Sequence, residues 1–158
     1  MGTIITILLL IVLAYLVYTE YFKQRDFMSF RESLDLVELP IVTFRQGDKK
    51  LNFILDTGAN RSIINKDDEA TIISEDTGLN SKVLGIEGSV SHVSLKNIKF
   101  TYKNKEFEDT FQVLDISKTV NAYKTKKGVI IHGLIGNGFM QKYKYVLDFK
   151  EMVAYSKR

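Results

Sequence analysis

The stretch LDTGANRSIINKDDEATIISEDTGLN, residues 55–80, contains the tripeptide Asp-Thr-Gly twice. The first copy, Asp56-Thr57-Gly58, follows the apolar strand-like run LNFIL and precedes Ala59 and a second strand-like run, SIIN. A glycine at such a position lets the backbone turn closely against a neighbour, and a threonine hydroxyl can tie the loop down. The first copy therefore has the setting of a buried, tightly folded turn that presents a functional carboxylate.

The second copy, Asp76-Thr77-Gly78, lies in a stretch rich in charge, between Ser74-Glu75 and Leu79-Asn80. Aspartate and glycine are the expected residues of exposed turns for purely local reasons. The tripeptide is short, so either copy taken alone is compatible with an ordinary turn. Of the two copies, the context favours the first as a functional site and predicts that the second is an exposed turn.

Short β-like runs separated by turn residues surround the first copy. The runs 41–44 and 51–55 are joined by RQGDKK, which predicts a hairpin. One helical stretch is expected near 139–143. Further strands are expected at 82–86, 90–95, 98–102, 107–114 and 129–135. Regular short strands with turn signals between them favour a small all-β barrel or sandwich.

The composition limits the possible chemistry of the chain. Its 158 residues, 45% of them hydrophobic, can bury one core. The absence of cysteine excludes disulfides, thiolate metal sites and cysteine nucleophiles. His92 and His132 are the only histidines and are interpreted as ordinary strand residues. The acidic run 67–69 lacks the alternating spacing of a calcium loop and is interpreted as a solvated helix start. We expect neither a metal nor another cofactor.

A lysine-rich stretch at 118–127 is the most basic part of a chain whose net charge is only +3. Proteins that bind nucleic acids tend to combine such charges with aromatic platforms, and here Tyr123 stands alone. This segment is therefore interpreted as a solvated loop, and no nucleic-acid partner is expected.

The N-terminal residues 1–19, MGTIITILLLIVLAYLVYT, carry no charged side chain. As a helix they would span about 28 Å, close to the hydrocarbon thickness of a bilayer. A cleaved signal peptide is the alternative, although a basic start and a small-residue cleavage site are missing. The sequence predicts an uncleaved, single-pass transmembrane helix over 1–20.

The residues after this helix bear on its orientation. Lys23, Arg25 and Arg31 follow closely, and the positive-inside rule then places the C-terminal domain in the cytoplasm. Acidic residues among them leave the opposite side open. Residues 21–38 are interpreted as a polar stalk, and 39–158 as the globular domain.

The second half of the chain adds a motif that must be considered with the first Asp-Thr-Gly. Residues 131–140 are IHGLIGNGFM, with VLDF following at 146–149, and a glycine-bearing segment, VLGIEGSV, lies between the two motifs at 83–90. In this order they resemble the retropepsin-like family of aspartic proteases over residues 39–155. The resemblance implies a closed β-barrel with one short helix, in which Leu134-Ile135-Gly136 packs behind the Asp-Thr-Gly loop.

The resemblance also implies a catalytic role for Asp56, Thr57 and Gly58. The chain is too short for two catalytic lobes, and Asp76 follows Asp56 too closely to belong to a second one. The second carboxylate must then come from a second copy of the chain, in a symmetric homodimer. Two such carboxylates share one proton and can activate a water that hydrolyses a bound polypeptide. In this arrangement Thr57 would brace the partner loop, and the Gly58 amide would donate toward the carboxylates.

Substrate contacts are also implied by the resemblance. Ala59 would line the floor of the cleft, and Gly85 and Gly88 would let a flap bend over the substrate with Ile86 near its tip. The sequence thus predicts a membrane-anchored aspartic endopeptidase. The alternative is a catalytically inactive dimerisation or peptide-binding module of the same fold at the membrane.

Two departures from the family pattern follow Gly136. Asn137 stands where compact viral members have arginine, and Gly138 stands where many cellular relatives have an acidic residue. The first difference concerns ion pairs that stabilise the dimer, and the second concerns support of the catalytic loop.

Overall fold

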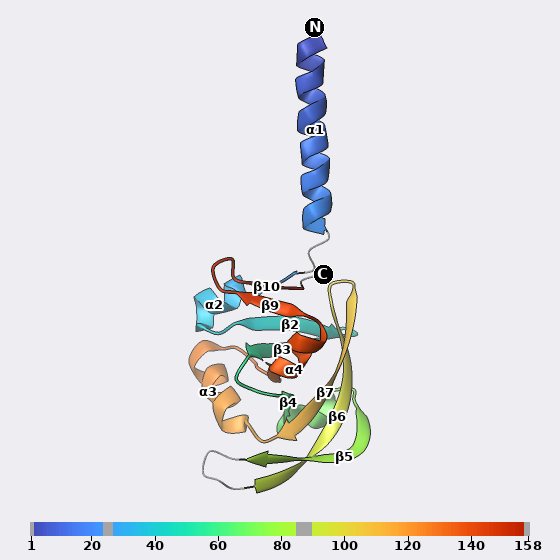
Figure 1. The fold of residues 1–158 in the computed structure, drawn as a ribbon. Helices are drawn as coiled ribbons and strands as arrows, with labels where there is room; N and C mark the ends of the chain where they lie inside the picture. The colour runs from blue at the N-terminus through green and yellow to red at the C-terminus, as the bar shows by residue number, and fades with distance from the viewer. Residues whose placement is uncertain (1, 24–26, 85–89, 157–158) are drawn as a thin grey trace.

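The computed structural model describes residues 2–23, 27–84 and 90–156, and outside its first helix it is mainly β (Figure 1). The main sheet contains β2 (Ile41–Gln46), β3 (Lys49–Asp56), β4 (Ser62–Asn65), β5 (Glu75–Leu84), β6 (Val90–Tyr102), β7 (Lys105–Leu114) and β8 (Gly133–Gly136). These seven strands have the order β2-β3-β8-β4-β7-β6-β5, and a bridge between Arg45 and Thr101 pairs β2 with β6. The ring closes through this bridge, which confirms the expected β-barrel.

Alternating burial fixes the register of the barrel strands. In β3, Leu51, Phe53 and Leu55 are buried while the residues between them are more exposed, as expected for a strand with one face in the core. Aromatic rings fill the interior, and Phe44 meets Phe100 edge-on with 4.8 Å between ring centroids. A slip by one residue would bring the apolar face of β3 out of the core. The position of Asp56 at the end of β3 is therefore fixed by packing.

The predicted hairpin over residues 41–55 is confirmed. Strands β2 and β3 pair antiparallel from Ile41 opposite Ile54 to Gln46 opposite Lys49. The two-residue turn begins with Gly47, whose φ of 59° is a conformation that glycine adopts at little cost.

Strand β8 lies between the two strands that flank the first Asp-Thr-Gly. It pairs parallel with β3, Leu55 opposite Ile135, and antiparallel with β4, Ile63 opposite Leu134. A Cβ at Gly133 would clash with the backbone carbonyl of Ile63. Glycine at this position lets β4 approach β8 closely, and the loop between β3 and β4 passes over the end of β8.

The helices correct the expectation of a single one. Helix α4 (Asn137–Lys142) confirms the helix predicted near 139–143, but α3 (Ser117–Lys127) occupies the segment predicted as a lysine-rich loop. Val120 of α3 is buried in a second apolar cluster, where Ile116 and Tyr123 are partly buried. Their spacing places these three side chains on one helical face, while the lysines remain exposed. This apolar stripe of three residues was the sequence signal for a helix, and the many lysines around it made the segment look like a loop.

The segment predicted as a polar stalk, residues 21–38, forms part of the domain from Phe27 onward. Strand β1 (Phe27–Ser29) pairs with β10 (Val153–Ser156), which pairs with β9 (Tyr145–Asp148), in a separate three-stranded sheet. Helix α2 (Arg31–Val37) follows β1. Met28 and Phe30 are fully buried in the main core. Two apolar side chains among charged neighbours thus fold this segment onto the barrel.

Two further helical elements complete the described chain. The 3₁₀ helix η1 (Lys66–Thr71) has the acidic run in its first turn, which confirms the predicted helix start. Helix α1 (Gly2–Lys23) carries apolar side chains that are exposed, from Ile4 at 65% to Tyr18 at 59%. No helix in the described residues has the length and apolarity needed to span a bilayer. The helix predicted at the N-terminus is confirmed, whereas its predicted membrane span is not.

Candidate active site

The first Asp-Thr-Gly forms a turn at the end of β3. The Gly58 N–H donates to Asp56 Oδ1 at 2.8 Å, and the Ala59 N–H donates to the Asp56 backbone carbonyl at 3.3 Å. The Asp56 side chain is partly exposed, and Thr57 and Gly58 are exposed. The loop thus fixes one carboxylate oxygen with its own backbone and leaves the carboxylate within reach of solvent.

Three consecutive amides at the start of α4 support this loop from behind. The bonds are Gly136 N–H to Ser62 Oγ at 3.1 Å, Asn137 N–H to Ala59 O at 2.7 Å and Gly138 N–H to Asn60 O at 3.1 Å. The first amides of a helix have no partner within the helix and need acceptors elsewhere. The loop after Asp56 supplies these acceptors, so helix and loop fix each other in place.

Gly136 lies close against the backbone of the loop. It is paired with Asp56 in the parallel register of β3 and β8. A Cβ at this position would lie 2.5 Å from the carbonyl carbon and oxygen of Arg61 and 2.9 Å from the carbonyl oxygen of Ala59. The expectation that Leu134-Ile135-Gly136 packs behind the loop is confirmed by this geometry.

The predicted substrate-binding residues are described only in part. Ala59 is half-buried in the loop, and its carbonyl is occupied by the Asn137 amide. Gly85, Ile86 and Gly88 lie outside the described residues. The strands on either side of them pair as a hairpin whose last described pair joins Leu84 and Val90. Their role as a flap stays a prediction.

The second Asp-Thr-Gly lies inside β5, where the sequence predicted an exposed turn. The register with β6 shifts between Asp76 and Asn80, and Gly78 at φ 68° forms part of this bulge. The Thr77 hydroxyl donates to the Leu95 carbonyl at 2.9 Å. The tripeptide here shapes a strand, and β5 pairs only with β6 among the described strands.

The carboxylate of the second copy is engaged on the surface. Asp76 accepts the Gly78 N–H at 2.9 Å and forms an ion pair with Lys96 at 3.0 Å, and Lys96 also lies 3.4 Å from Glu69. The Gly78 amide and the Lys96 ammonium hold the pKa of Asp76 below its ordinary value. A carboxylate stabilised in its charged form at the surface is suited to an ion pair and poorly suited to exchanging protons with a substrate.

Asp76→Asn is expected to leave catalysis within about twofold of wild type, as for surface substitutions in general. The asparagine Oδ1 can still accept the Gly78 N–H, so the bulge is retained while the ion pair with Lys96 is lost. The measurement is kcat/KM for peptide cleavage. A large loss would identify the second copy, and not Asp56, as the functional one.

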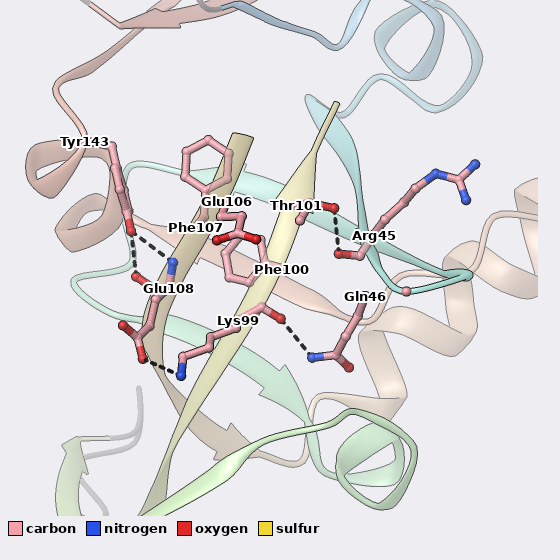
Figure 2. Close-up of a pocket in the computed structure, with 10 residues that line it drawn as sticks. Arg45, Gln46, Lys99, Phe100, Thr101, Glu106, Phe107, Glu108 and Tyr143 are labelled. Atoms are coloured by element: carbon pink, nitrogen blue, oxygen red, sulfur yellow. Dashed lines mark hydrogen bonds and ion pairs between the residues drawn. The ribbon is translucent and has the colours of Figure 1, made fainter. Parts of the chain in front are cut away.

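A surface pocket of about 330 Å³ lies between the β2–β3 turn and strands β6 and β7 (Figure 2). Its polar groups bond one another: Gln46 Nε2 donates to the Lys99 carbonyl at 2.9 Å, and Tyr143 Oη bonds both the N–H and the carbonyl of Glu108. Another pocket, of about 490 Å³, lies beside α2 and β2. Asp56 lines neither of these two pockets.

No group of three or more His, Cys, Asp or Glu side chains is placed to hold a metal ion, within the ranges that the structure covers.

His132 has a structural role next to β8. Its Nδ1 accepts the Asn52 backbone N–H at 3.0 Å, and the backbone N–H of His132 donates to the Asn52 carbonyl at 2.9 Å. A ring nitrogen that accepts a hydrogen bond must be unprotonated, so the imidazole is neutral here. Burial is the largest influence and lowers the pKa of His132, Asp68 opposes this effect, and Lys49 adds to it.

The fold is expected to lose stability as the pH falls below the ordinary histidine value of about 6.5. The folded-state pKa of His132 is lowered, so the unfolded chain binds the proton first. The contribution of neutral His132 to the free energy of unfolding is complete above the ordinary histidine pKa. It is lost as the pH falls through the lowered pKa of the folded state. Denaturant unfolding at several pH values measures it. His132→Gln should show a weaker pH dependence, and the exposed His92→Gln is the control that should not.

A closed β-barrel with an Asp-Thr-Gly loop backed by a glycine-ended strand defines a domain of the aspartic protease class. Residues 37–148 match the family described as retroviral aspartyl protease. This match covers more than half of the chain, and the chain belongs to this family. No match was found among curated proteins. Family membership supports a general aspartic protease function.

Proposed function

We propose that the protein is an aspartic endopeptidase whose catalytic pair consists of Asp56 from two identical chains. The observation that carries this proposal is the Asp56 loop itself. Its carboxylate is partly exposed, receives the Gly58 N–H at 2.8 Å, and rests on a strand that has no side chain at Gly136. This is a partly exposed carboxylate that is held in place by the backbone around it.

A second subunit supplies what one chain lacks. The described residues include one loop of this construction, since Asp76 belongs to a strand bulge and pairs with Lys96. A two-fold axis next to the loop would bring two Asp56 carboxylates together, and Thr57 and Gly58 are exposed where such contact is needed. The homodimer is therefore part of the proposed active site.

The two carboxylates would act as general base and general acid. At close range both cannot be ionised without a large cost, so the pair keeps one proton. The ionised member takes a proton from a bound water as the water oxygen attacks the peptide carbonyl carbon. The protonated member gives its proton to the carbonyl oxygen. The first member then gives the proton that it took from water to the amide nitrogen as the C–N bond breaks. The second member takes back a proton from a hydroxyl of the tetrahedral diol as the new carboxyl group forms, and the pair returns to its first state.

Polypeptides are the substrates that this geometry fits. The hairpin of β5 and β6 would cover an extended chain bound over the two loops, with Gly85, Ile86 and Gly88 near the substrate. Ala59 adds a small side chain beside the carboxylate, which leaves room for a peptide backbone.

The non-catalytic alternative predicts a different outcome for the same surface. A peptide-binding or dimerisation module of this fold would bind polypeptides and release them intact. The presence of Asp56 with Thr57 and Gly58 beside it favours hydrolysis, because a module that only binds has no need of a positioned carboxylate.

Membrane attachment stays a prediction. It is supported by the absence of charged side chains from residues 1–19 and by the exposure of apolar side chains along α1. The positive charges that follow place the protease domain in the cytoplasm under the same prediction.

The test of the proposed function is cleavage of a mixture of unstructured peptides by the full-length chain in a mild detergent, measured by mass spectrometry. Specific activity should fall on dilution as the dimer dissociates, because each subunit contributes half of the site. Activity that stays constant in a species shown to be monomeric would contradict the shared site. Peptide binding without cleavage would favour the non-catalytic module.

A further inference from the structure

Asp109 of β7 is connected to the candidate active site through a buried serine. The Ser62 hydroxyl donates to Asp109 Oδ2 at 2.5 Å, and the Gly136 N–H donates to the same hydroxyl oxygen at 3.1 Å. Ser62 is 1% exposed. An amide can only donate, so the hydroxyl oxygen must accept from Gly136, and its single proton is left for Asp109.

This connection differs from the other two that support the loop. Asn137 and Gly138 donate to backbone carbonyls, which are present whatever the side chains are. Gly136, the residue paired with Asp56, donates to a side chain instead. The orientation of that side chain depends on the acceptor for its proton, and the acceptor is Asp109.

We propose that Asp109 is a positioning residue for Asp56, acting through the Ser62 hydroxyl and the Gly136 amide. This inference rests on the proposed function. The Asp109 carboxylate orients the Ser62 hydroxyl, and the hydroxyl holds the Gly136 amide of β8 behind the loop. Because Gly136 is paired with Asp56, β8 then sets the position of Asp56 relative to Asp56 of the second subunit. Hydrogen bonds to an ionised acceptor are short and strong, in agreement with the short distance between Ser62 and Asp109.

The charge state of Asp109 is compatible with this role. Burial raises its pKa above the ordinary value, while the Ser62 hydroxyl, the Thr110 amide and the charges of Lys142 and Arg61 oppose the rise. The bonds that oppose it stabilise the ionised form, which is the form that accepts the Ser62 proton.

Asp109→Ala should lower kcat by about 10- to 100-fold with little change in KM, since a small displacement of a reacting group costs rate more than binding. Asp109→Asn keeps an acceptor oxygen of the same shape and should restore most of kcat. Ser62→Ala should reproduce the loss, and adding Asp109→Ala to it should cost little more. The matched control is Glu108→Ala on the opposite face of β7, which should remain near wild type.

Hydrogen exchange of the Gly136 amide tests the same connection without activity. Exchange should be faster in Asp109→Ala and Ser62→Ala than in wild type, and near wild type in Asp109→Asn. Wild-type kcat and wild-type exchange in Asp109→Ala would overturn the inference. If Asp109→Ala does not fold, Ser62→Ala removes the same connection with the loss of one oxygen atom. A wild-type chain that does not cleave would refute the proposed function, while the exchange measurement would still decide the role of Asp109.

Discussion

Asp56→Asn is expected to reduce kcat/KM for peptide cleavage on the order of 10³-fold or more, because the change removes both proton-exchanging groups of the dimer. Asparagine has nearly the same shape as aspartate. Its Oδ1 can still accept the Gly58 N–H that now reaches Asp56 at 2.8 Å. The loop and the barrel should therefore remain folded, and the loss should concern the chemistry alone. Cleavage kinetics, with sedimentation to check the oligomeric state, measure the effect.

Mixing the variant with wild type tests whether the site is shared. After subunits have exchanged at equal amounts, about one dimer in four is wild type in both subunits. Activity should then be about one quarter of that of pure wild type at the same total protein concentration. If each chain carried a complete site, half of the activity would remain. An Asp56→Asn protein that cleaves peptides like wild type would remove Asp56 from the mechanism.

The parts of the fold that the sequence predicted have strong local signals. The hairpin of β2 and β3 has alternating apolar residues around a turn that contains Gly47, and α4 follows directly after Gly136. The two Asp-Thr-Gly copies also differ in local context, although the second forms a bulge within β5 and not the predicted exposed turn. A strand of apolar residues delivers the first copy, and charged residues surround the second.

The parts that were missed depend on contacts between residues distant in the chain. Strand β1 is held by pairing with β10, in which Phe27 lies opposite Tyr155 near the other end of the sequence. The local sequence around Phe27 does not indicate this distant partner. Ser62 and Asp109 are 47 positions apart and are common residue types in strands. Their connection exists only because β4 and β7 lie side by side in the barrel.

Gly136→Ala is expected to be among the most damaging single-methyl additions in this chain, with a loss of about 3 kcal/mol or more in the free energy of unfolding. The new Cβ would lie 2.5 Å from the Arg61 carbonyl, and because that carbonyl belongs to the backbone, no side-chain rotation relieves the contact. The loop would have to move away from β8. Because Gly136 is paired with Asp56, activity should fall further than stability alone explains.

Gly138→Ala is the matched control for this substitution, two residues along the same turn. Its Cβ would lie 3.1 Å from the Asn60 carbonyl, so a shift of a few tenths of an ångström suffices. Alanine also favours the helical conformation of α4 by up to about 1 kcal/mol over glycine, which offsets part of that cost. Thermal unfolding and kcat are measured for both variants. The comparison shows whether the damage comes from the steric contact behind Asp56 or from adding a methyl group anywhere in this turn. Equal behaviour of the two variants would contradict the close approach of β8 to the loop, and with it the support on which the position of Asp56 depends.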